Sequence, residues 1–408
     1  MRIERTGRVV RGLAIPVLAI AGMLAFAVPA VGEPVGTPVT PGGEIRAWGG
    51  QPDGPESPTD HGQLDFPALA GGETYTAIAA GTEHSIALTS SGRIVGAGTS
   101  PQSTPPPAPA GERFTAISAG PDYSLALTST GDVLCFGSDA DGQCSGPADS
   151  TERFTAIAAG YRHSLALTES GQVRAFGDNE FDETNLPTDR TYTAIAAGAD
   201  FSLALTSTGE VVGVGKDWAN STNTSNTHLA PAPDGERYVA IAAGESHALA
   251  LTSGGRVAAG GYARYGQNEA PGPPAGQTFT AVAAGRDHSL ALTSEGGIVG
   301  WGSSRSGQRG EWNETARAYV FDPAPTGLRY TAIAGGAFHT LAVAAPPALE
   351  PEPEPSDCAA TGSASSGSLS TGLGSEWSTP VSSATFGLSC SGSAVLLDLG
   401  SLGAFVGS

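Results

Sequence analysis

Apolar and polar residues recur along the chain in one pattern that occurs seven times. A copy begins with an aromatic residue and continues as a stretch such as TAIAAG, a stretch such as SLALT and a stretch of the form G-x-[IV]-x-x-x-G. In SLALT, Leu165 and Leu167 alternate with Ser164, Ala166 and Thr168. Alternation with a period of two is typical of β-strands. The pattern therefore predicts three short strands per copy.

The spacing of the copies indicates the architecture. Steps of 39, 40, 38, 46, 41 and 51 residues separate the aromatic residues at their heads, which are Tyr75, Phe114, Phe154, Tyr192, Tyr238, Phe279 and Tyr330. A period near 40 residues with strand-like content is typical of the blades of a β-propeller. We expect an all-β, seven-bladed β-propeller.

The two ends of the repeat array complement each other. GEIRAWG, from Gly43, is a third piece with no first or second piece before it, and TAIAGGAFHTLAV has no third piece after it. Pairing of the N-terminal strand with the last blade would close the ring and remove exposed sheet edges. The propeller is therefore expected to span residues 43–343. Between the first two strands of every copy stands a glycine, which we expect to supply a turn conformation that other residues reach only with strain.

Composition agrees with many short strands and turns, since the chain holds 58 Gly and 30 Pro and only 15% charged residues.

The N-terminus has four arginines before an apolar run and small residues near Ala27 and Ala30, the pattern of a cleaved secretory signal peptide over residues 1–30. The alternative, a transmembrane anchor, is disfavoured because Pro16 and Pro29 interrupt the run. We expect a secreted or cell-envelope-associated bacterial protein with no transmembrane segment after cleavage.

The net charge of the protein limits which classes of molecule it can bind. The net charge is −20, and without residues 1–30, which hold four Arg and one Glu, 16 basic and 39 acidic residues remain, a net charge of −23. A phosphate backbone would be repelled, so nucleic acid is excluded as a partner.

Four cysteines are expected to form two disulfides, each within one segment. The pairs are Cys135 with Cys144 and Cys358 with Cys390. Residues 31–42 form a linker, residues 344–356 are rich in Pro and Glu and form a stiff spacer, and residues 357–408 form a Ser/Gly-rich tail.

GxxHSLALT followed by GxVxxWG resembles the repeat of the regulator of chromosome condensation (RCC1) family over about three quarters of the chain. That resemblance implies seven blades. The chromatin and GTPase-exchange role of the best-known members fits poorly with a signal peptide and acidic charge. The secreted bacterial branch, which includes seven-bladed β-lactamase inhibitors, implies instead a rigid protein-binding face.

Strand order identifies that face. If the first strand runs up, the first-to-second turn and the loop after the third strand share one rim, and the monotonous second-to-third turns (TSSG, TSTG, TESG) lie on the other. The doublets after the turn glycine all differ: Thr82-Glu83, Pro121-Asp122, Tyr161-Arg162, Ala199-Asp200, Glu245-Ser246, Arg286-Asp287 and Ala337-Phe338. Free variation of solvated turns is the alternative explanation.

By resemblance to the inhibitors, we expect the doublets and the loops after the third strands to bind a protein partner. Aromatic residues in those loops would act as anchors. The candidate partner-binding residues are Glu83, Asp122, Tyr161, Arg162, Asp200, Glu245, Arg286, Asp287 and Phe338 with Phe181, Trp218 and Trp312 from the loops. The inhibitors' face is richer in aromatics, which makes β-lactamase itself a less favoured target.

Candidate chemistry is weak. His84, His163, His247, His288 and His339 recur before the second strand and suggest a metal or general-base cluster. Tyr123 and Phe201 fill the same slot, which favours packing and turn hydrogen bonding instead. We expect no metal site, cofactor or catalytic residue, and a non-enzymatic protein-binding module. The alternatives are a cell-envelope polysaccharide-binding protein and an enzyme with a site on the propeller axis.

Overall fold

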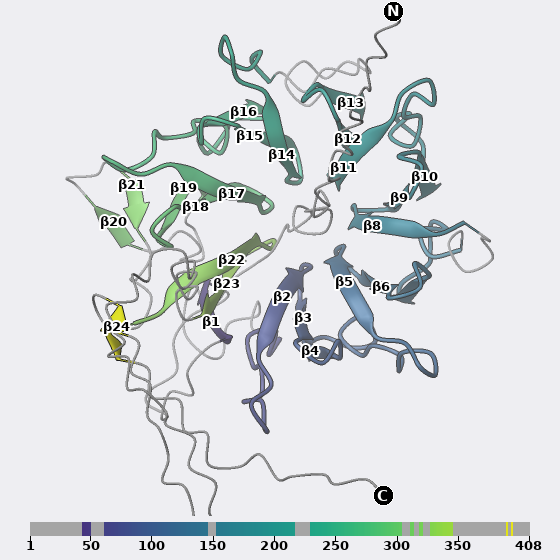
Figure 1. Cartoon of the computed structure of the whole chain (residues 1–408). Coiled ribbons are helices and arrows are strands. Elements are labelled where there is room, and N and C mark those ends of the chain that lie inside the picture. The colour runs from purple at the N-terminus through teal and green to yellow at the C-terminus, as the bar shows by residue number, and fades with distance from the viewer. Residues whose placement is uncertain are drawn as a thin grey trace, which may run out of the picture. The chain divides into compact units, whose positions relative to one another are not determined.

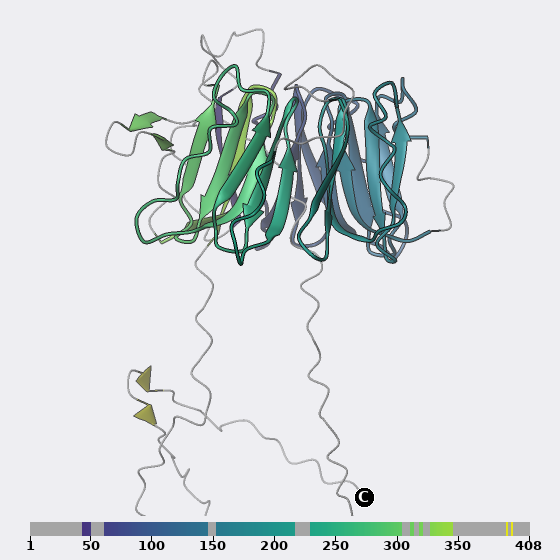
Figure 2. The same cartoon turned by 90° about the horizontal axis from the view of Figure 1, so that it is seen from above.

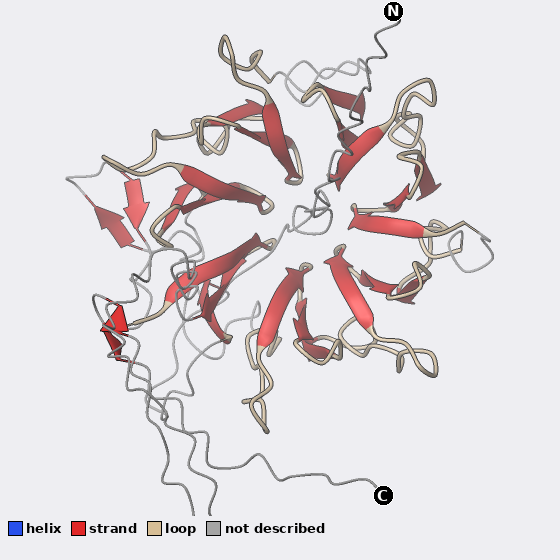
Figure 3. Ribbon diagram, in the orientation of Figure 1, coloured by secondary structure: helices blue, strands red, loops and turns tan. Residues whose placement is uncertain are grey.

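The computed structural model describes residues 43–49, 61–145, 152–216, 229–303 and 327–345, together with short strands at 311–313, 318–320, 389–390 and 393–394. The chain divides into two units, Met1–Pro347 and Ala348–Ser408. All elements in the described ranges are strands, joined by turns and loops (Figure 3). The expected all-β class is confirmed.

The first unit is a seven-bladed propeller, seen along its axis in Figure 1. Each blade is an antiparallel sheet with the first strand of the repeat innermost. In chain order the blades contain β2 (Tyr75–Ala80), β3 (His84–Thr89) and β4 (Ile94–Gly98); β5 (Phe114–Ala119), β6 (Tyr123–Thr128) and β7 (Val133–Gly137); β8 (Phe154–Ala159), β9 (His163–Thr168) and β10 (Val173–Gly177); β11 (Tyr192–Ala197), β12 (Phe201–Thr206) and β13 (Val211–Gly215); β14 (Tyr238–Ala243), β15 (His247–Thr252) and β16 (Val257–Gly261); β17 (Phe279–Ala284), β18 (His288–Thr293) and β19 (Ile298–Gly302); β22 (Arg329–Gly335) and β23 (His339–Ala345). We number these blades 1 to 7.

The ring closes as expected, because the N-terminal strand completes blade 7. β1 (Glu44–Gly49) pairs antiparallel with β23, with Glu44 opposite Ala344 and Gly49 opposite His339. Blade 6 is extended by β21 (Ala318–Val320) and β20 (Glu311–Asn313), so that Trp312 lies in the outermost described strand of that sheet. The last strand of the propeller ends at Ala345, two residues beyond the expected boundary.

Packing between blades explains the strict repeat. Every residue of the second strands β3, β6, β9, β12, β15 and β18 is buried, since neighbouring sheets cover both faces. The aromatic head of each copy is also buried, and its backbone N–H bonds a glycine carbonyl of the preceding blade, as from Phe154 to Gly131 at 2.9 Å. Burial of this kind is the main driving force for holding the ring together.

The turn glycine between the first two strands has a different role from the one expected. Gly81, Gly160 and Gly244 do not adopt positive φ, so the expectation of a special turn conformation is wrong. A Cβ at Gly244 would lie 2.3 Å from Cε1 of His247 and 2.5 Å from the carbonyl oxygen of Gly285 in the next blade. Glycine is required because the histidine ring and the adjacent blade approach the backbone so closely.

The second unit contains one described hairpin, β24 (Ser389–Cys390) with β25 (Ser393–Ala394). Cys390 lies in β24, whereas Cys358 and the expected Cys358–Cys390 disulfide lie outside what the structure describes. The expected signal peptide, the linker 31–42, residues 346–356 of the expected spacer and Trp218 also lie outside the described residues.

Candidate functional site: one rim of the propeller

The doublets and the loops after the third strands lie on one rim, as expected from strand direction. In six blades the residue after the third strand donates its backbone N–H to the carbonyl of the second doublet residue, as from Asp178 to Arg162 at 2.9 Å and from Tyr262 to Ser246 at 2.9 Å. Each of these six blades therefore presents a doublet and a loop side by side on the same rim of the ring. Figure 2 shows the ring edge-on, with its two rims. We call this surface the doublet rim.

The opposite rim is uniform because its turns bond to themselves. In the turn after β6, the Thr128 hydroxyl accepts the backbone N–H of Asp132 at 3.1 Å and pairs with the Thr130 hydroxyl at 2.9 Å. Gly131 closes the same turn with φ of 87°, a conformation that favours glycine. The TSTG-type sequence is thus explained by local turn structure. The hydrogen bonds of the doublets run instead between backbone atoms, as from Tyr161 to the carbonyl of Gly198 at 3.1 Å, and do not select a side chain.

Both large hydrophobic side chains that are exposed within the described residues lie on the doublet rim. Tyr161 is 40% exposed and Tyr262 is 36% exposed. Tyr161 was among the expected residues and Tyr262 was not. Tyr262 could have been predicted from the sequence, because it occupies the position directly after the third strand. Asp178 and Lys216 hold the same position in blades 3 and 4.

Arg286 connects three blades on this rim. Its Nε lies 2.8 Å from Oε2 of Glu245 in blade 5 and 3.7 Å from Oδ2 of Asp287, and its guanidinium lies 5.5 Å from the ring centre of Phe338 in blade 7. Burial raises the pKa of Glu245, and Arg286 opposes that shift. Four of the expected residues are thus brought together.

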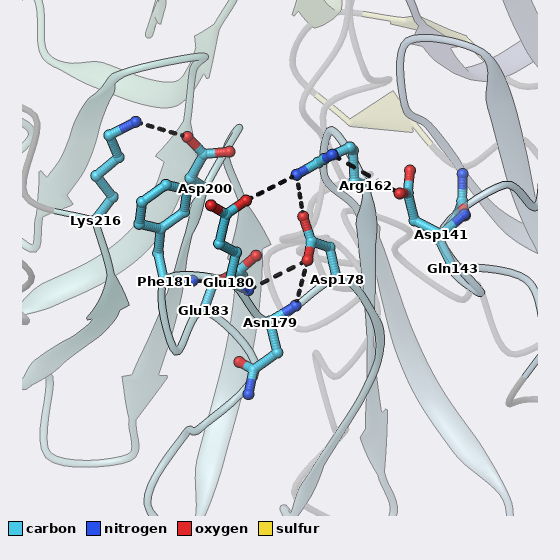
Figure 4. Close-up of polar contacts among 10 residues, drawn as sticks. All are labelled: Asp141, Gln143, Arg162, Asp178, Asn179, Glu180, Phe181, Glu183, Asp200 and Lys216. Atoms are coloured by element: carbon cyan, nitrogen blue, oxygen red, sulfur yellow. Dashed lines mark hydrogen bonds and ion pairs between the residues drawn. The ribbon is translucent and has the colours of Figure 1, made fainter.

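A second network surrounds Arg162 (Figure 4). Its guanidinium forms ion pairs with Asp178, with Glu180 at 3.5 Å and with Asp141 of the blade 2 loop at 3.8 Å. In blade 4, Lys216 forms an ion pair with Asp200 at 3.2 Å. The basic side chains of these networks are therefore already held by carboxylates, and the rim keeps an acidic surplus.

Phe181 is placed differently from an exposed anchor. Its ring is half-buried under Lys216, whose Nζ lies 4.4 Å from the ring centre (Figure 4). Beside it, Glu183 is buried and accepts the backbone N–H of Phe181 at 2.8 Å. Burial raises the pKa of the Glu183 carboxyl. In blades 2 and 5 a glutamine, Gln143 or Gln267, makes the equivalent bond without a charge.

The remaining expected residues are dispersed around the ring. Glu83 pairs with His61 at 3.3 Å in blade 1, and Asp122 is exposed in blade 2. Trp312 lies at the outer edge of blade 6, away from the doublets along the sheet.

A cavity of about 120 Å³ lies on the axis at the doublet end. The last residues of the innermost strands line it, among them Ala80, Ala119, Ala159 and Ala197, and isoleucines lie deeper. Tyr161, Glu245 and Arg286 also line it. The cavity therefore joins a shaft lined largely by small aliphatic side chains to the charged and aromatic doublet rim.

The five histidines clamp adjacent blades. His84, His163 and His247 each place Nε2 within 2.8–2.9 Å of a serine hydroxyl in the next blade. His288 reaches Thr340 at 2.8 Å, and His339 reaches Ser85 at 3.4 Å across the closure. Packing is confirmed, but the side-chain hydrogen bonds run between blades rather than within the turn.

These histidines are all buried, which disfavours the charged form of an imidazole. Ser289 donates its hydroxyl to the carbonyl of Gln267 at 2.8 Å, so His247 must donate its Nε2–H to Ser289. Burial lowers the pKa of His84, His163 and His247 to about 4. No His, Cys, Asp and Glu within the described ranges form a group of three that could hold a metal ion.

Between blades 4 and 5, an apolar pair of residues stands in place of the histidine–hydroxyl hydrogen bond. Phe201 occupies the histidine slot of blade 4, and the next blade carries Ala248 where the other blades carry Ser or Thr. Both residues are buried in the same apolar cluster. A phenylalanine cannot bond a hydroxyl, so the loss of the hydroxyl at 248 matches the loss of the imidazole at 201. Tyr123 keeps a polar link, since Ser164 donates to its hydroxyl at 3.0 Å.

Two further observations concern the setting of the protein. The Cys135–Cys144 disulfide is formed, as expected. Across the described ranges, the chain has no helix long and apolar enough to cross a membrane.

Comparisons with known proteins agree with this architecture. The sequence profile of the regulator of chromosome condensation (RCC1) repeat matches residues 114–143, 154–183, 192–217 and 279–308. Four segments of the chain are therefore similar in sequence to the RCC1 repeat, and the fold is similar to that of solved RCC1-like propellers. No curated protein sequence matches the chain.

Two solved structures illustrate the similarity of fold. Human WBSCR16 is 20% identical with a TM-score of 0.57, over 68% of this chain and 88% of its own. Prp20p from Saccharomyces cerevisiae is 19% identical with a TM-score of 0.55, over 67% and 83%. That structure is described together with the binding of Prp20p to Gsp1p and histones.

Proposed function

We propose that this protein is an exported, non-enzymatic binding module whose doublet rim docks a protein partner. The observation that carries the proposal is the contrast between the rims. One holds seven dissimilar doublets and both exposed aromatic side chains, whereas the turns of the other are explained by their own hydrogen bonds. Aromatic and arginine side chains are enriched where interfaces are strongest.

Several features support this reading. Arg162 and Arg286 are held in place by ion pairs across blades, so a partner would meet a preorganised surface. The acidic surplus favours a partner with a basic surface through faster association. The signal-like N-terminus and the Cys135–Cys144 disulfide support export, since disulfides persist in oxidising compartments.

A pull-down from secreted and envelope fractions tests the proposal. Wild type is compared with a variant carrying Tyr161→Ala, Arg162→Glu, Asp287→Lys and Phe338→Ala, and with a control carrying Glu169→Lys and Ser207→Leu on the opposite rim. We expect wild type and control to retrieve the same protein and the doublet-rim variant to lose it. Retention by that variant would refute the assignment. Binding only to a glycan array would favour the polysaccharide alternative, and turnover of a substrate panel the enzyme alternative.

A further inference from the structure

The axial cavity has the size and chemistry of an anchor pocket. A cavity of about 150 Å³ with apolar walls is large enough to hold a benzene molecule. This one measures about 120 Å³; alanine, glycine and isoleucine form most of its wall, and polar atoms also contribute to its surface. It therefore suits the end of one aliphatic side chain and is too small for a folded element.

The side chains that form the cavity wall remain accessible from the axis of the propeller. Ala80, Ala119, Ala159 and Ala197 are only partly buried although they end the innermost strands, because they face the axis. Their methyl groups would contact an aliphatic occupant, which would gain by leaving water.

The mouth of the cavity lies within the doublet rim, where acidic side chains outnumber basic ones. Tyr161 and Glu245 line it from blades 3 and 5. Burial is the largest cause that raises the pKa of the Tyr161 hydroxyl, and Glu245, Asp122 and Asp200 raise it further against Arg286. The doublets together carry five carboxylates, from Glu83, Asp122, Asp200, Glu245 and Asp287, against two arginines, Arg162 and Arg286. Arg286 is already engaged by Glu245.

We propose that this cavity receives an aliphatic side chain at the tip of a basic loop of the protein partner. The tip residue fills the alanine-lined shaft, and the Lys or Arg residues beside it pair with the carboxylates of the doublets. This inference rests on the proposed function and adds to it the chemistry of the partner. Charge complementarity selects a basic loop over an acidic one.

A disulfide-closed peptide, Cys-Lys-Lys-Leu-Lys-Lys-Cys, is the probe, with fluorescence polarisation as the readout at low and at physiological salt. Matched peptides carry Ala in place of Leu, or Glu in place of every Lys. We expect saturable binding of the Leu peptide, roughly 10-fold to 100-fold weaker binding of the Ala peptide because a buried Leu is lost, and no binding of the Glu peptide. Salt should weaken the binding.

Variants locate the binding site on the protein. Ala80→Leu and Ala119→Leu each fill the shaft, and Ser207→Leu introduces the same side chain on the exposed opposite rim. Circular dichroism confirms which variants fold, and the peptide series needs no variant at all. We expect either shaft variant to weaken binding at least 10-fold and Ser207→Leu to leave it unchanged.

Two outcomes of the peptide experiment would overturn this inference. Neither would refute the proposed function, which the pull-down tests separately. One is equal affinity for the Leu and Ala peptides, which would place a basic peptide on the rim but outside the cavity. The other is the absence of saturable binding by the Leu peptide. Loss of partner capture in the doublet-rim variant, together with either outcome, would support the docking rim without the axial anchor.

Discussion

The clamp between blades 5 and 6 gives a quantitative prediction. His247 and Ser289 are 1% and 0% exposed, and His247 Nε2 lies 2.8 Å from the Ser289 hydroxyl. Ser289→Ala removes the acceptor and leaves a buried N–H without a partner. An unsatisfied buried donor costs about 1–3 kcal/mol. The Gln267 carbonyl loses the Ser289 donor but keeps Trp301 Nε1 at 2.9 Å.

The double variant His247→Phe with Ser289→Ala should be more stable than the sum of its single variants. It recreates the pair that the chain already uses at Phe201 and Ala248, where neither side needs a hydrogen bond. We expect a coupling energy of about 1 kcal/mol or more in favour of the double variant.

Equilibrium urea unfolding of wild type, the two single variants and the double variant measures that coupling. The reciprocal change, Ala248→Ser, should destabilise the protein, and adding Phe201→His should restore part of the loss. If the His247 and Ser289 variants add to within about 0.5 kcal/mol, the two side chains act independently. The explanation of the histidine repeat as an inter-blade clamp would then be refuted.

Three other predictions concern stability. Gly244→Ala should cost about 1–3 kcal/mol in urea unfolding, because its Cβ would overlap His247 and the next blade. Replacing Cys135 and Cys144 with serine should cost about 2–3 kcal/mol by opening a short loop, also measured in urea. Glu183→Gln should raise the urea midpoint at pH 7. The raised pKa of Glu183 means that its charged form destabilises the fold, so the gain should vanish below pH 4.

Acidification provides one more test, because the folded protein holds several histidines neutral. Burial lowers the pKa of His84 and His163 to about 4, so the unfolded chain binds more protons between pH 6.5 and 4. Stability should therefore fall as pH drops through that window, by at most about 1.4 kcal/mol per pH unit for each histidine. A flat urea midpoint from pH 7 to 5 would contradict the neutral, buried state.

The sequence predicts those features of the fold that follow from its period. Seven copies with complementary ends imply a closed ring, and β1 on β23 confirms it. Strand direction likewise places Tyr161 and the loop after β10 on one rim. Such inferences need only the order of the pieces along the chain.

Side-chain contacts between blades could not be predicted from the repeat pattern. Nothing in the spacing shows that Arg286 would reach Glu245 and Phe338, or that Lys216 would cover Phe181. The role of Gly244 was misjudged for the same reason, since the atoms that exclude a Cβ belong partly to another blade. The pair Phe201 and Ala248 was detectable, because both depart from the repeat at consecutive blades.

Site-specific photocrosslinking tests most directly whether the doublet rim docks a partner. The photoreactive residue p-benzoylphenylalanine replaces Tyr161, Tyr262 or, on the opposite rim, Ser207, and crosslinked proteins from envelope and secreted fractions are identified by mass spectrometry. We expect Tyr161 and Tyr262 to capture one common protein that Ser207 does not capture. Equal capture from both rims, or capture from Ser207 alone, would contradict the account.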